Sequence, residues 1–151
     1  MQIDEIKPEE CYAFLGNVSV GRLACSFENQ PYVVPIYFAY EKGYIYVFST
    51  FGQKVKWMRA NPKVCIQADE IQNPSEWISV IAEGEAEELA EPKHAAERQH
   101  ATSLLAKRYQ WWLNALGERQ VRVGDKAIDP LFFRIRIQTT SGLRATDEKK
   151  S

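Results

Sequence analysis

The chain has 151 residues, of which 45% are apolar and 26% charged, and its formal net charge is −1. This is the composition of an ordinary globular protein, and it excludes a mainly disordered chain. The small net charge disfavours a dedicated nucleic-acid-binding protein, which normally carries a strong positive excess. We expect one domain over residues 1–144, a polar tail over residues 145–151, and no nucleic acid as partner.

The cysteines indicate the compartment. Cys11, Cys25 and Cys65 are odd in number and form no C-x-x-C pair, so we interpret them as reduced, buried thiols. The sequence has no recognisable N-terminal signal peptide and no apolar run of about 18 residues that could span a bilayer. We therefore expect a cytoplasmic protein with no membrane partner.

The first part of the chain predicts a short helix followed by three strands. The helix begins near Pro8 and ends at Gly16-Asn17, because proline suits the first turn of a helix and glycine suits its end. The strands cover residues 18–27, 32–40 and 44–49. Short polar turns separate them, which predicts an antiparallel meander.

A second helix is expected from Gln53 to Ala60, because Asn61-Pro62 ends it. Further strands are expected over residues 64–68, 77–86 and 131–139. Before the last strand, residues 92–116 carry apolar side chains at helical spacing, which predicts a long helix packed on another element. Its aromatic residues Tyr109, Trp111 and Trp112 fit core or dimer contacts, or alternatively a surface for a protein partner.

Six strands in hairpin order with few helices between them predict a mainly β (α+β) fold, either an antiparallel barrel or a sandwich. Residues 33–38 and 44–48 are apolar on both faces, so both faces need cover. One long helix cannot cover that much surface. We therefore expect a homodimer, in which a second copy covers the rest.

The sequence offers no convincing acid–base or metal site. His94 and His100 are six residues apart on the expected helix, about 120° away from a shared face, and we interpret both as surface histidines. Neighbouring carboxylates such as Glu87-Glu88 point to opposite faces of a strand. No G-x-S-x-G, P-loop or G-x-G-x-x-G motif is present. We therefore predict no catalytic side chain and no metal ligand.

The most informative feature is the turn between the strand 44–49 and the helix 53–60. Helix N-termini favour acidic side chains or bound anions, yet Lys54 and Lys56 stand in the first turn without a nearby acid. A bound phosphate would remove this conflict. The alternative is a solvated lysine on an ordinary surface helix. The aromatic strands nearby suit a planar anionic cofactor that carries its own redox chemistry.

Five segments occur in a characteristic order and spacing. They are Gly21-Arg22-Leu23-Ala24, Pro31-Tyr32-Val33-Val34-Pro35-Ile36, Tyr44-Ile45-Tyr46-Val47-Phe48-Ser49, Gly52-Gln53-Lys54 and Asn61-Pro62-Lys63-Val64. Together they resemble the pyridoxamine 5'-phosphate oxidase-like FMN-binding split-barrel family, especially its small, nitroimidazole-resistance-like members. The similarity covers about residues 10–88, and the strand over 132–144 also looks family-like. The resemblance implies a six-stranded split β-barrel with flanking helices and FMN at a homodimer interface.

Carried over by position, the resemblance assigns the FMN phosphate first to Lys54, with Gly52 and Gln53 as further donors. Ser49 and Thr50 would contact phosphate or ribityl oxygens. The true oxidase has an arginine-lysine pair where this chain has Gln53-Lys54, which makes oxidation of pyridoxamine phosphate doubtful.

The resemblance also implies contacts away from the phosphate. Val34, Pro35 and Ile36 would lie along the edge of the flavin ring, Ser79 near the ribityl chain and Trp77 at the dimer seam. The resulting hypothesis is an FMN-binding homodimeric oxidoreductase that uses reduced nicotinamide and a small-molecule acceptor. The alternative is a non-catalytic module that binds or stores flavin or haem.

Overall fold

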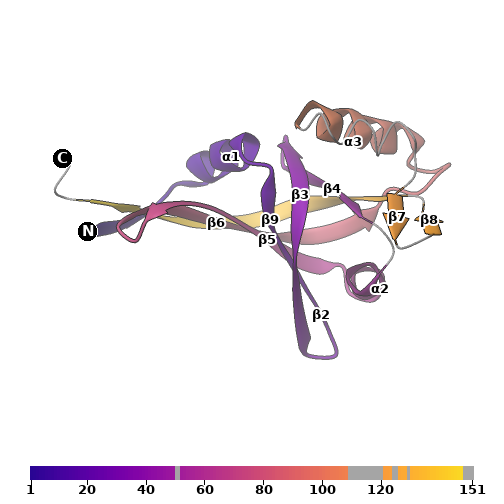
Figure 1. Ribbon diagram of the computed structural model, residues 1–151, viewed down its shortest axis with the longest axis horizontal. Helices are drawn as coiled ribbons and strands as arrows, with labels where there is room; N and C mark the ends of the chain where they lie inside the picture. Colours follow the sequence, from indigo (N-terminus) through magenta and orange to yellow (C-terminus); the bar gives the residue numbers. More distant parts are fainter. Residues whose placement is uncertain (50–51, 109–120, 124–125, 129, 148–151) are drawn as a thin grey trace.

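The structure is a computed structural model that describes residues 1–49, 52–108, 121–123, 126–128 and 130–147. Within these ranges the chain forms helices α1 (Pro8–Asn17), α2 (Gln53–Ala60) and α3 (Ala95–Arg108) (Figure 1). The strands are β1 (Gln2–Glu5), β2 (Val20–Phe27), β3 (Gln30–Glu41), β4 (Tyr44–Ser49), β5 (Lys63–Asn73), β6 (Glu76–Glu88), β7 (Val121–Val123), β8 (Lys126–Ile128) and β9 (Leu131–Thr146).

Seven of the described strands form one antiparallel sheet in the order β1-β9-β4-β3-β2-β5-β6, and pairing of β6 with β9 closes it. Strands β7 and β8 form a separate two-stranded ribbon. The expected mainly β (α+β) split-barrel fold class is therefore confirmed. Strand β1 adds a seventh strand to the expected six. The sequence pattern missed it because all four of its side chains are exposed and show no apolar alternation.

Strand β3 leaves one edge open. Its residues 30–37 pair with β2 and its residues 38–41 pair with β4, and no described strand pairs with Pro31 to Pro35 on the side away from β2. The Phe38 N–H donates to the Ser19 carbonyl (2.9 Å). This bond makes Phe38 and Ser19 a hydrogen-bonded pair. Because hydrogen-bonded and non-bonded pairs alternate along an antiparallel ladder, the backbone groups of Pro31, Val33 and Pro35 point away from β2, toward the open edge. Proline has no N–H to pair, so this is the edge where the strand tolerates it.

The barrel interior holds the main hydrophobic core. Leu23, Phe38 and Ile66 point inward from their strands and are fully buried. Leu15 of α1 and Val55 of α2 complete this core from outside the sheet. Figure 1 shows α1 above the sheet and α2 below it. Burial of these side chains therefore fixes the position of α2 beside the barrel.

Helix α3 covers the outer side of β4 and β9 and forms a second, smaller core. Its Ala101 and Leu105 pack with Tyr46 and Phe132. The expectation that this helix packs on another element is confirmed for Ala95–Arg108. The predictions for Tyr109, Trp111 and Trp112, and for the helix beyond residue 108, lie outside the described residues.

Strand β9 is longer than expected. It runs to Thr146, and Ala145 is 3% exposed and pairs with Ile3 of β1. The residues expected to begin the polar tail at position 145 are thus part of the sheet. The physical reason is β1, which provides a pairing partner that the local pattern did not reveal. Residues 148–151 lie outside the described part of the chain.

The three cysteines are free thiols, as expected. Cys11 and Cys25 are buried, whereas Cys65 is only partly buried, because it points to the outer side of β5. No helix in the described ranges combines the length and apolar character needed to cross a membrane.

Candidate functional site

The candidate site centres on the connection between β4 and α2. Strand β4 ends at Ser49, which is 4% exposed and lies opposite Leu131 of β9. Gly52 precedes α2 in an extended conformation, and apart from its chain neighbours no atom of the described residues lies within 4 Å of the position that a Cβ would occupy. The predicted contact Thr50 lies outside the described residues. The start of α2 is therefore accessible to a ligand on the Gly52 side.

The first turn of α2 carries the positive end of the helix dipole. Lys56 N–H donates to the Gly52 carbonyl (3.2 Å) as the first bond within the helix, so the N–H groups of Gln53, Lys54 and Val55 have no partner inside the helix. This turn contains no acidic residue, and no side chain hydrogen-bonds its cap. Such a turn can bind an anion.

Lys54 brings a half-buried ammonium group to this turn. Burial lowers the pKa of Lys54 below its ordinary value of 10.5, and the Cys25 thiol opposes this shift. Burial also raises the pKa of Cys25, and Lys54 lowers it. The two side chains therefore lie close together on the inner side of β2. Since burial favours the protonated, uncharged form of the Cys25 thiol, the partly desolvated Lys54 ammonium would gain from an anionic ligand.

Helix α2 and the open edge of β3 belong to one structural unit, the β2–β3 hairpin with α2 packed on it. The Trp57 ring of α2 lies edge-on against Tyr32 (5.6 Å between centroids) and tilted against Phe27 (6.2 Å). Figure 1 shows α2 beside this projecting hairpin. The open edge offers a flat ligand the N–H of Val33 and the carbonyls of Val33 and Pro35.

The structure places the three predicted ring-edge residues differently from one another. Pro35 is exposed at the open edge, whereas Ile36 is 5% exposed and, with half-buried Val34, points into the core. The backbone groups of Val34 and Ile36 face β2. Val33, which is not among the predicted residues, is 61% exposed at this edge. A signal was available, because two prolines four residues apart in one strand mark its unpaired edge, and Val33 lies between them.

Ser79 and Trp77 lie apart from the α2 turn within one chain. Both are on the outer side of β6, at the end of the sheet remote from α2 (Figure 1). Ser79 pairs with Asp69 of β5. Asp69 is five residues beyond Val64, which lies opposite Cys25, a separation of about 17 Å along the strand. The structure therefore does not bring these two predicted contacts to the Lys54 turn of the same chain.

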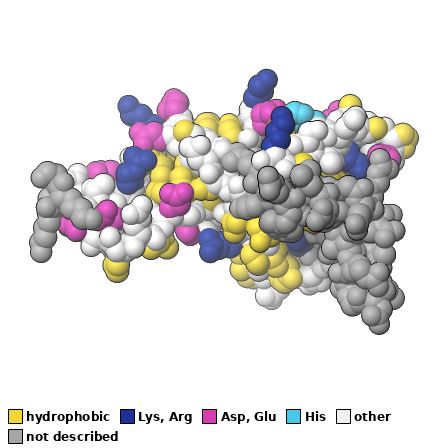
Figure 2. Space-filling model, turned by 45° about the horizontal axis from the view of Figure 1, so that its top comes forward, with side chains coloured by type: hydrophobic (Ala, Val, Ile, Leu, Met, Phe, Trp, Pro, Cys, Tyr) yellow, Lys and Arg dark blue, Asp and Glu magenta, His cyan; other side chains and the backbone are white. Residues whose placement is uncertain are grey.

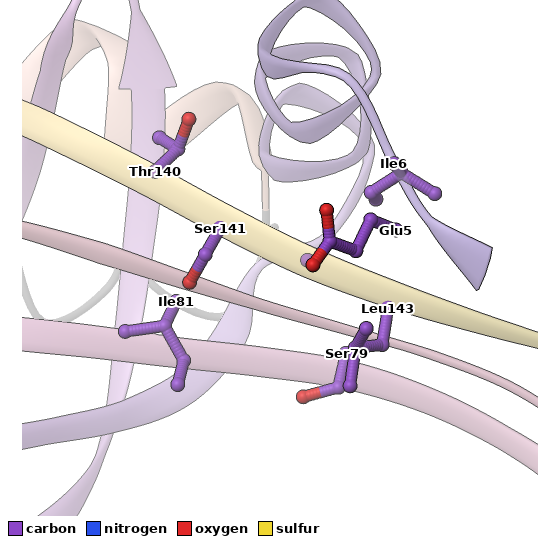
Figure 3. Close-up of a pocket in the computed structure, with 8 residues that line it drawn as sticks. Glu5, Ile6, Ser79, Ile81, Thr140, Ser141 and Leu143 are labelled. Carbon is purple, nitrogen blue, oxygen red and sulfur yellow. The ribbon is translucent and has the colours of Figure 1, made fainter. Parts of the chain in front are cut away.

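Ser79 is one of the residues that line a pocket of about 420 Å³ (Figure 3). Its lining residues are Glu5, Ile6, Ser79, Ile81, Thr140, Ser141, Gly142 and Leu143. Figure 3 shows these side chains arranged between β6, β9 and the segment that leads from β1 into α1. The pocket offers hydroxyl groups and one carboxylate on a different part of the barrel from the α2 turn.

No group of three or more His, Cys, Asp or Glu side chains that could hold a metal ion occurs in the ranges that the structure describes. Instead, each histidine contacts one carboxylate of the sheet: His94 Nε2 lies 3.2 Å from Glu87 Oε1, and His100 Nε2 lies 2.8 Å from Glu41 Oε1. His100 is on the surface as expected. The His94 side chain is only 13% exposed, because the start of α3 folds it against β6.

Comparison with known proteins places this geometry in context. The chain is 40% identical to a FAD-binding protein (mll6688) of Mesorhizobium loti, with a TM-score of 0.78 over 97% of this chain and 100% of that one. It is 43% identical over 105 residues to the uncharacterized protein RA0666 of Rhizobium meliloti (strain 1021), covering 69% of this chain and 70% of the relative.

A more distant structure shares the fold alone. A candidate 5-nitroimidazole antibiotic resistance protein of Bacteroides thetaiotaomicron is 19% identical, with a TM-score of 0.68 over 97% of this chain and 93% of that one. A family model described as pyridoxamine 5'-phosphate oxidase matches residues 7–144. The protein therefore belongs to the pyridoxamine 5'-phosphate oxidase family, as its five sequence segments indicated.

Proposed function

We propose that this protein is a homodimeric flavoprotein that binds FMN and acts as an oxidoreductase. The observation that carries the proposal is the half-buried Lys54 in the acid-free first turn of α2. This helix packs on the hairpin that carries the open edge of β3. A bound flavin supplies the redox chemistry, for which we assign reduced nicotinamide as electron donor and a small molecule as acceptor. The protein supplies binding and orientation.

The first turn of α2 suits the phosphate of FMN, and the open edge of β3 suits its flavin ring. Phosphate oxygens would accept hydrogen bonds from the Gln53 N–H and the Lys54 ammonium, which are charge-assisted contacts. The pyrimidine edge of the flavin presents an N–H between two carbonyls. The Val33 N–H can donate to one of those flavin carbonyls, and the Val33 carbonyl can accept from the flavin N–H. Ser49 stays a proposed contact at the end of β4.

The relative in Mesorhizobium loti supports a flavin, since it is a FAD-binding protein. FMN is the part of FAD that contains the ring, the ribityl chain and the first phosphate, so the same turn could receive either. We propose FMN because half-buried Lys54 and the helix N-terminus together match a terminal phosphate. Gln53 adds no charge, so the proposal does not extend to oxidation of pyridoxamine phosphate.

The test of this proposal is the spectrum of the purified protein. We expect a yellow protein with nearly one flavin per chain, and FMN rather than FAD after acid release and chromatography. Anaerobic NADH or NADPH should bleach the flavin absorbance. A colourless protein that does not bind added FMN would contradict the proposal. A flavin that binds but is never reduced would favour the non-catalytic binding module, and a haem spectrum would favour its haem version.

We also propose that a second copy of the chain covers part of the outer side of the barrel. Val20, Val33, Tyr37 and Ile81 are 39–61% exposed and project outward from β2, β3 and β6. Figure 2 shows apolar side chains gathered at the lower edge of the molecule, where the β2–β3 hairpin projects. Apolar groups of this kind commonly mark protein interfaces. Helix α3 covers the outer side of β4 but leaves these side chains exposed.

Val20→Glu is expected to shift the protein from dimer to monomer, because the substitution would bury a carboxylate in the interface without a partner. Sedimentation velocity of wild type and variant at equal concentration measures the shift. Ser103→Glu adds the same charge to an exposed position of α3 and should leave the dimer intact. A wild-type protein that sediments as a monomer would contradict the dimer proposal.

A further inference from the structure

We propose that Asn61 is a positioning residue that fixes the first turn of α2 relative to the open edge of β3. The inference rests on the proposed flavin site. It concerns how the phosphate end and the ring end of that site are held at a constant separation. Asn61 contacts neither end itself, so its effect is exerted through the orientation of α2.

Asn61 joins three elements. Its Nδ2 donates to the Ser26 carbonyl of β2 (3.1 Å), and its Oδ1 accepts from the Lys63 N–H at the start of β5 (3.2 Å). Its backbone N–H donates to the Trp57 carbonyl (2.7 Å) and so closes the end of α2. One residue therefore connects the helix to two strands.

The Ser26 carbonyl is available because no strand in the described ranges pairs with it on the side of β5. Ser26 lies opposite Pro31 in a pair that exchanges no backbone hydrogen bonds, so its carbonyl faces away from β3. On that side β5 pairs with β2 only as far as Cys25, opposite Val64. The Asn61 side-chain amide donates to the Ser26 carbonyl in place of the backbone N–H of a further β5 residue. An unpaired carbonyl in this partly buried position would cost free energy.

Burial of Val55 holds α2 against the barrel, and the remaining contacts of α2 leave its tilt relative to the hairpin to Asn61. The helix has only eight residues, and helices this short need tertiary anchors. Trp57 gives it an apolar contact with the hairpin. Arg59 forms a two-pronged ion pair with Glu88 (2.6 and 3.3 Å), but Glu88 belongs to β6, so this pair does not hold the helix to the hairpin. The Asn61–Ser26 hydrogen bond is the directional contact to the hairpin that carries the open edge.

A small tilt of α2 around Asn61, at the end of the helix, displaces Lys54 at its start. Lys54 lies seven residues before Asn61, about 10 Å along the helix axis. A tilt of about 10° around Asn61 would move Lys54 by about 2 Å, since the displacement scales with this length. Hydrogen bonds to a phosphate do not survive a shift of that size. The phosphate contact should therefore be more sensitive to Asn61 than the ring contact.

The experiment compares FMN with riboflavin, which lacks the phosphate. The ratio of the two dissociation constants, measured by titrating the full-length apoprotein, reports the phosphate contact alone. Asn61→Asp keeps the Oδ1 acceptor for Lys63 and removes the donor to Ser26. We expect the preference for FMN to fall about tenfold in this variant, with riboflavin binding retained. Asn61→Ser, which adds no charge, should behave alike and serves if the aspartate variant does not fold.

The outcomes separate this inference from the proposed function. Arg59→Gln, on the same helix, should keep the wild-type preference. If the Asn61 variants kept the wild-type preference for FMN over riboflavin, the positioning role would be overturned. Equal weakening of FMN and riboflavin binding would also overturn it, because that result indicates general destabilisation. If the wild-type protein itself does not prefer FMN, the phosphate-binding turn is wrong, and the inference about Asn61 is wrong with it.

Discussion

Lys54→Met is expected to weaken FMN binding about 10- to 100-fold, so that the purified variant retains little flavin. A charge-assisted hydrogen bond contributes about 1.5–3 kcal/mol, which corresponds to this range. Methionine fills a similar volume at this half-buried position, so the substitution mainly removes the charge. Titration of the apoprotein with FMN and with riboflavin measures the effect. Riboflavin affinity should change little, because it lacks the phosphate.

The same substitution should leave the apoprotein at least as stable as wild type. Burial lowers the pKa of Lys54, so the charged form is less favourable in the folded protein than in the unfolded chain. This unfavourable contribution is fully present below the folded-state pKa and is lost as pH rises toward 10.5. Removing the charge removes it, so the melting temperature without flavin should be equal or higher at neutral pH.

The matched control for Lys54 is Lys63→Met, which makes the same charge change at an exposed position at the start of β5. It should keep wild-type FMN affinity. Loss of FMN and riboflavin binding together in Lys54→Met would indicate that the whole site is disturbed. Unchanged FMN affinity would show that the lysine does not bind the phosphate.

Gly84→Ala is expected to destabilise the protein by about 3 kcal/mol. Gly84 lies at the irregularity where the register between β6 and β9 shifts. A Cβ at this position would overlap the carbonyl oxygen of Arg136 and lie 2.9 Å from its carbonyl carbon. Both atoms are backbone atoms of β9, so a side-chain rotation cannot relieve the overlap. The pairing that closes the barrel must separate locally, and urea unfolding measures the loss.

Gly16→Ala provides the control for this substitution. Gly16 lies in α1, and a Cβ there would contact only Tyr40, at an ordinary 3.8 Å. Alanine favours a helix over glycine by about 0.5–1 kcal/mol, so this variant should be as stable as wild type or more stable. Equal unfolding midpoints for Gly84→Ala and wild type would mean that the β6–β9 seam can accommodate a side chain there.

The local elements around the site follow directly from the sequence. Strand β4 and helix α2 have the expected bounds, 44–49 and 53–60. The strand is a continuous apolar run between turns, and Asn61-Pro62 ends the helix by excluding helical angles before proline. The acid-free first turn of α2 was also readable, because it depends on which residues are adjacent in the chain. Patterns with a range of three or four residues are therefore sufficient for the phosphate end of the site.

The residues at the open edge of β3, where we propose that the flavin ring binds, could not be predicted from such short-range patterns. Pro35, Val34 and Ile36 are consecutive, yet only Pro35 presents its backbone to the open edge. Which of them does so depends on the register with β2, and a shift by one residue would exchange the two sets. Strand β1 escaped prediction for a related reason: its pairing with β9 connects opposite ends of the chain.

The sequence by itself determined the family, the fold class and the lysine-bearing turn, because these depend on short-range order, apolar periodicity and chain-stopping residues. Only the tertiary structure decided that Lys54 lies beside Cys25, that Asn61 reaches Ser26, and that Ser79 and Trp77 lie at the remote end of β6. These relations join residues far apart in the chain. They arise from strand register and from the burial of α2 against the hairpin, which residue order alone does not specify.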